Sequence, residues 1–70
     1  MDNKLPFDQI RKIRSVLVDA TRNANEANDI GNQTDVLFYK GQVLGIANIL
    51  QIIDTDKNIN ITFYLNQLPS

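Results

Sequence analysis

The hydrophobic pattern from residue 35 to residue 54 predicts one long helix with two separate apolar sides. The larger side recurs at steps of three and four residues and consists of Val36, Tyr39, Val43, Ile46, Ala47, Leu50 and Ile53. Such steps place side chains on one side of an α-helix. A smaller set, Phe38, Gly45, Ile49 and Ile52, lies roughly 120° away around the same helix. Because one neighbouring helix cannot cover both sides, we expect this helix to have more than one packing partner.

An amphipathic pattern also precedes it and predicts a first helix over about residues 6–28. Pro6 suits the first helical position, and Asp8 lies near the positive end of the helix dipole. The apolar side of this helix consists of Ile10, Ile13, Leu17, Ala20, Ala24 and Ala27. The opposite side is polar and is expected to face solvent.

Residues 29–34 predict a short turn between the two helices. Gly31 can adopt the left-handed conformation that ends a helix, and Asn32 or Thr34 can cap the next helix, over about residues 34–54. Folding back places Val36, Phe38 and Tyr39 beside the alanines of the first helix. We therefore predict an all-α fold, an antiparallel helical hairpin with a coiled-coil-like crossing.

The C-terminal segment, residues 58–68, fits two patterns. Ile59, Ile61, Phe63 and Leu65 alternate as in a strand, whereas Ile61, Tyr64, Leu65 and Leu68 repeat as in a helix. A single strand has no partner inside a helical hairpin. We expect a short third helix, with a strand as the alternative.

Composition indicates how so small a chain is stabilised. The 70 residues form a single domain, residues 1–70, and contain neither cysteine nor histidine. Disulfides and thiolate or imidazole metal sites are thereby excluded, and we expect no metal and no cofactor. Self-association is the remaining means of stabilisation. We predict a homodimer or higher oligomer that forms a helical bundle.

Charge and hydropathy bear on location. The net charge is −1, which gives no overall attraction to DNA or an anionic membrane. The most hydrophobic stretch is interrupted by Lys40, Gln42, Asn48 and Gln51, and the first residues contain no apolar signal region. We expect a soluble cytoplasmic protein with no membrane partner.

The smaller apolar side of the second helix is the candidate protein or oligomer interface: Phe38, Gly41, Gly45, Ile49 and Ile52. Two glycines inside a helix each cost about 1 kcal/mol relative to alanine. A close helix crossing in an oligomer compensates for that cost. In the alternative interpretation, the glycines are merely tolerated or accommodate a bulky neighbour within the chain.

Positive charge concentrates at the start of the first helix, in Lys4, Arg11, Lys12 and Arg14. A dimer would double this patch, which could then bind nucleic acid or a small anion held between subunits. Asp2 and Asp8 lie among the same residues, and no known nucleic-acid-binding motif is present. We therefore keep a nucleic-acid-associated regulator and an anionic-ligand binder or sponge as alternatives.

Residues 54–58 and the carboxylates of the chain are the remaining candidates for metal binding and catalysis. Residues 54–58 begin like a calcium loop, but Ile59 stands where glycine is needed and Leu65 where a glutamate is needed. We expect a helix end and a polar turn there. Catalysis without histidine or cysteine would fall to carboxylates on a solvated face, so we predict no enzyme.

The preferred prediction is a non-enzymatic protein-interaction module that acts as a homo-oligomer. It would be an inhibitor, adaptor or regulator that occupies a surface of another protein. The run from Tyr39 to Gln42 in the second helix also resembles that of short phage or bacterial accessory proteins.

Overall fold

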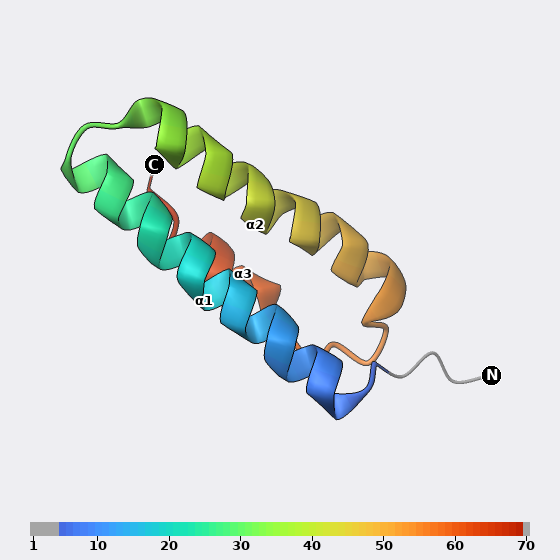
Figure 1. Ribbon diagram of the computed structural model, residues 1–70. Coiled ribbons are helices and arrows are strands. Elements are labelled where there is room, and N and C mark those ends of the chain that lie inside the picture. Colours follow the sequence, from blue (N-terminus) through green and yellow to red (C-terminus); the bar gives the residue numbers. More distant parts are fainter. Residues whose placement is uncertain (1–4, 70) are drawn as a thin grey trace.

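The computed structural model describes residues 5–69 and shows an antiparallel pair of long helices with a short third helix. The helices are α1 (Phe7–Asp29), α2 (Gln33–Ile53) and α3 (Ile61–Leu65), and no strand occurs in this part of the chain. Figure 1 shows α1 and α2 side by side along their whole lengths, in a molecule 46 × 18 × 16 Å in extent. The predicted all-α hairpin is confirmed, while the dimer and the coiled-coil crossing stay predictions.

The turn between α1 and α2 forms as its residue types predict. Gly31 adopts a left-handed conformation with φ 77°, and the backbone N–H of Asn32 returns to the Ala27 carbonyl at 2.9 Å. The Asn32 side chain, rather than Thr34, caps α2, because its Oδ1 accepts a hydrogen bond from the Asp35 N–H at 3.2 Å. α1 therefore ends one residue later than predicted, and α2 begins and ends one residue earlier.

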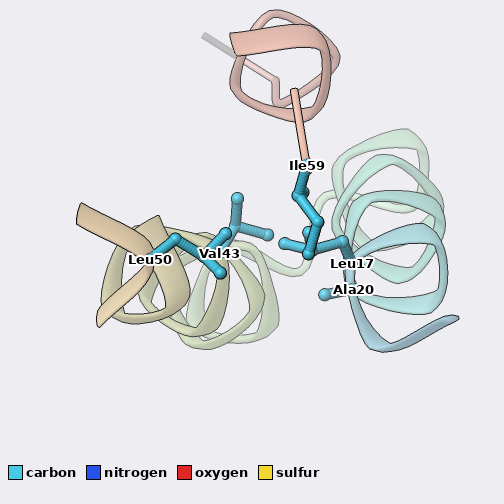
Figure 2. Packing of buried hydrophobic residues seen from close by; sticks show 5 residues of the cluster. All are labelled: Leu17, Ala20, Val43, Leu50 and Ile59. Carbon is cyan, nitrogen blue, oxygen red and sulfur yellow. The ribbon is translucent and has the colours of Figure 1, made fainter. Parts of the chain in front are cut away.

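The core lies along the seam between the two long helices. Figure 2 shows Leu17 and Ala20 of α1 facing Val43 and Leu50 of α2, with Ile59 reaching between the helices from the C-terminal segment. Leu17 and Val43 are completely buried. The larger apolar side of α2 is therefore the inner side, since each of its members is buried or half-buried.

The prediction that Phe38 packs beside the alanines is wrong. Val36, Ala24 and Ala27 are buried, but Phe38 remains 58% exposed and meets Tyr39 edge-on, with ring centroids 5.1 Å apart. The physical reason is helical phase: Phe38 lies about 140° from Val43 around α2, so it cannot share the seam that Val36 occupies.

The C-terminal segment forms the short helix α3 rather than a strand, and it lies over one side of the seam between α1 and α2 (Figures 1 and 2). Two side chains of α1 hold it in place. The Arg14 guanidinium donates to the Asn58 carbonyl, and the Asn25 amide donates to the Gln67 carbonyl, each at 2.8 Å. Because both anchors come from α1, the segment stays over the seam. The side of α2 that faces away from α1 remains open.

Candidate interaction surface

The side of α2 opposite Val43 is an exposed and largely apolar surface, which we call the outer face. Its members are Leu37, Phe38, Gly41, Leu44, Gly45, Asn48, Ile49 and Ile52. Leu37 and Ile52 are the most open of its large side chains, at 68% and 73% exposed. Neither α1 nor α3 shields them, so the hairpin leaves an apolar helix surface in contact with water.

All five predicted interface residues lie together on this outer face. Phe38, Ile49 and Ile52 are more than half exposed, and the C-terminal segment does not cover them. Sequence analysis missed Leu37 and Leu44, which are 68% and 50% exposed. Their positions could have indicated them, because the series 37, 41, 44, 48 and 52 advances in steps of three and four.

The two glycines lie in the middle of the outer face with open space around them. A Cβ atom built at Gly41 or Gly45 would meet no other atom within 4 Å. The glycines therefore do not make room for a bulky neighbour within the chain. Within residues 5–69, no side chain packs into the space that the missing Cβ atoms leave, so the low helix propensity of the two glycines is not offset there.

Few charges border the outer face. Asp35 and Lys40 are the charged residues of α2, and both lie away from the centre of the face, toward the seam with the rest of the hairpin. By length and composition, α2 is also the one helix in the described residues that could cross a membrane, with only 17% of its most apolar window buried. Buried core helices of soluble proteins satisfy the same criterion.

The basic residues of α1 are not gathered into one site by the fold. Lys4 lies outside the described residues. Arg11 and Lys12 line a shallow depression with Asp8 and Ser15, and the Arg11 guanidinium is 6.0 Å from the centre of the Phe7 ring. Arg14 points toward the C-terminal segment and binds the Asn58 carbonyl. Arg11 and Lys12 are thus neighbours, whereas Arg14 serves as an anchor.

The turn after α2 is organised by Asp54, a role that sequence analysis missed. Its buried carboxylate accepts hydrogen bonds from the Ile59 N–H at 2.9 Å, the Asn58 N–H at 3.0 Å and the Asn58 amide at 3.1 Å. These bonds allow the chain to reverse, with Lys57 at φ 55°, and they place Ile59 in the core. Because the carboxylate is already occupied by N–H donors, it closes a turn, as expected for a polar helix end.

The same contacts determine the acidity of Asp54. Burial raises the pKa of the carboxyl group. Hydrogen bonds from Ile59 and Asn58 and the nearby charge of Lys57 together lower the pKa by more than burial raises it. The net result is a pKa below the ordinary value. Asp54 is therefore ionised at neutral pH and stabilises the turn as an anion.

Comparisons of the chain with protein-family models, with curated proteins and with solved structures found no match. The fold therefore defines the class, a small all-helical hairpin, and function is inferred from its surface geometry.

Proposed function

We propose that this chain is a non-enzymatic protein-interaction module that acts as a homo-oligomer. The observation that supports the proposal is the outer face of α2, which keeps Phe38, Ile49 and Ile52 more than half exposed on a folded hairpin. Exposed apolar patches of this kind on small proteins mark interaction sites. In this role the chain would inhibit, tether or regulate another protein by occupying its surface.

Burial of the outer face would contribute free energy to association. Complete burial of Phe38, Ile49 and Ile52 would contribute roughly 5 kcal/mol before the entropy cost of association is subtracted. Burial of Leu37 and Leu44 would add to this contribution. A self-associating α2 would also recover the stability that so small a core cannot supply.

The rest of the surface leaves room for a further partner. Phe7 at one end of α1 and Phe63 on α3 are 65% and 58% exposed, and both lie outside the outer face. A dimer formed through α2 would leave them open. Binding of another protein is therefore compatible with self-association.

Sedimentation equilibrium of three forms tests the proposal. Wild type is expected to sediment at twice the 7.9 kDa of one chain, and Ile49→Asp at the mass of one chain, because a buried aspartate in the interface would be unpaired. Val18→Asp is the matched control, since Val18 is 48% exposed on α1, close to the 54% of Ile49.

The control is expected to remain associated. Wild type and Ile49→Asp both sedimenting as monomers would contradict the proposal. Far-UV circular dichroism shows whether each variant retains its helices, and both substitutions replace exposed side chains.

A further inference from the structure

Four residues of the outer face of α2 are spaced symmetrically about Gly45 along the sequence. Phe38 lies seven residues before Gly45 and Ile52 seven residues after it, while Gly41 lies four before and Ile49 four after. When two copies of a helix run antiparallel across a two-fold axis, residues equally far before and after the axis face each other. A copy centred on Gly45 would therefore set Ile49 against Gly41 and Phe38 against Ile52.

We propose that the outer face binds a second copy of this chain, with the two α2 helices antiparallel and crossing at Gly45. This inference rests on the proposed function and names the partner and its orientation. At the centre, Gly45 meets Gly45 of the second copy, where the absence of Cβ atoms lets the two backbones approach closely. The open space found at both glycines is then the space that the second copy fills.

Size matching favours the antiparallel arrangement over a parallel one. In a parallel pair Phe38 would face Phe38 and Gly41 would face Gly41, which separates the helices at one level and leaves a void at the next. The antiparallel pair sets Ile49 against Gly41, which fills that void, and it sets Phe38 against Ile52 rather than against a second phenylalanine. It also places the positive end of each helix dipole beside the negative end of the other.

The area fits a second copy of the same helix. Five large side chains that are half to three-quarters exposed correspond to on the order of 500 Å² per chain, and so about 1,000 Å² for two chains. Specific protein interfaces begin at about this size. Asp35 and Lys40 lie outside the central strip that would be covered, so no charge is buried.

Single-cysteine variants test the orientation, because the natural chain contains no cysteine. Phe38→Cys and Ile52→Cys are mixed in equal amounts and oxidised mildly, and the products are separated by mass spectrometry. The mixed disulfide is expected to exceed the proportion that random pairing gives, since residues 38 and 52 of different copies are within bonding range. Val18→Cys mixed with Phe38→Cys is the control, for which no such excess is expected.

Gly45→Cys provides a second variant that removes no apolar side chain. Its added Cβ meets nothing within the chain, so the hairpin itself is undisturbed, and the variant is expected to form a disulfide with its own copy. Excess disulfides of Phe38→Cys with itself and of Ile52→Cys with itself would show a parallel pair and overturn the orientation. Absence of all four of these cross-links in a chain that sediments as a dimer would overturn the choice of face.

Vesicle flotation separates this inference from a lipid cover. Wild-type chain is expected to stay below vesicles of phosphatidylcholine and phosphatidylglycerol in a density gradient. Flotation with the vesicles would show that lipid covers α2 and would overturn the inference. A monomer by sedimentation would remove the proposed function as well, whereas a dimer with the wrong cross-links would remove only the arrangement.

Discussion

The outward sides of α1 and α2 differ sharply although the two helices have nearly equal lengths. On α1 the outward side carries Arg22, which pairs with Asp19 at 3.0 Å and with Glu26 at 3.6 Å. On α2 the corresponding side carries Phe38 and Ile52, both more than half exposed. α1 is therefore a helix adapted to water on one side, whereas α2 carries apolar residues on two opposite sides and is suited to burial on both.

This difference indicates that the exposed apolar surface is a property of α2 rather than of small hairpins in general. On α1, the side that faces neither α2 nor α3 carries charged residues. Apolar residues on the side of α2 that faces neither α1 nor α3 therefore indicate a neighbour outside the chain. The inner side and the outer face of α2 should therefore respond differently to substitution.

The largest effect is expected from the buried seam. Leu17→Ala removes a completely buried side chain and should destabilise the fold by about 3 kcal/mol, a transfer loss plus a cavity. Leu37→Ala makes the same change at a side chain that is 68% exposed and should lower the stability of the single hairpin by less than about 0.5 kcal/mol. Urea unfolding followed by circular dichroism, at a concentration where the chain is monomeric, measures both; equal effects would abolish the distinction between inner side and outer face.

A smaller effect is expected at the turn after α2, which keeps the C-terminal segment over the seam between α1 and α2. Asp54→Asn loses an anionic acceptor of three N–H bonds and should destabilise the fold by about 1 to 3 kcal/mol. Nuclear magnetic resonance chemical shifts of Ile59 should report its release from the core. Retention of both stability and the Ile59 shifts would show that Asp54 does not anchor the segment.

Asp54 also predicts how stability depends on pH. Its pKa is lower in the folded chain than in the unfolded one, so the folded state binds fewer protons and is favoured at higher pH. The contribution of Asp54 is complete above the unfolded pKa of about 4 and disappears as pH falls through the lower folded value. Thermal melts below about pH 5 should show a steeper loss of stability in wild type than in Asp54→Asn; parallel curves would contradict this account.

An opposite pair of effects is expected at the glycines. Gly41→Ala should stabilise the isolated hairpin by about 1 kcal/mol, because alanine has the higher helix propensity and its Cβ meets nothing within the chain. The same methyl group should weaken self-association, because it would occupy space that Ile49 of the second copy fills. Melting at low concentration and sedimentation at high concentration measure the two effects, and stabilisation without weaker association would place the interface elsewhere.

The smallest effect is expected on the outward side of α1. Arg22→Ala removes two exposed ion pairs and should change stability by less than about 0.5 kcal/mol and leave association unchanged. Its sedimentation profile should therefore match that of wild type. A shift to monomer would show that α1 rather than α2 contributes the interface.

The features that sequence analysis predicted correctly are those that depend on local periodicity. The steps of three and four in both helices, and Gly31 with Asn32 in the turn, are encoded within a few residues of each other. The anchors of the C-terminal segment are different, because Arg14 and Asn58 are 44 positions apart and Asn25 and Gln67 are 42 positions apart. No spacing rule relates such residues until the hairpin has brought them together.

The candidate surface was predicted in part for the same reason. Phe38, Ile49 and Ile52 share one arc of a helix, which periodicity alone can show. Leu37 and Leu44 lie between the larger and the smaller apolar side of α2, so their exposure depends on how far α3 extends around the helix. Periodicity can place them on the same side of α2 as Gly41 and Ile52, and the folded chain then shows that α3 leaves them uncovered.

Isotope-filtered nuclear Overhauser spectroscopy on a mixture of labelled and unlabelled wild-type chains tests most directly whether a second copy covers the outer face. We predict contacts between chains that involve the methyl groups of Ile49 and Ile52, and the strongest should join Ile52 to the ring of Phe38. Contacts between chains confined to α1 or α3, or none at concentrations well above those used for sedimentation, would contradict the account.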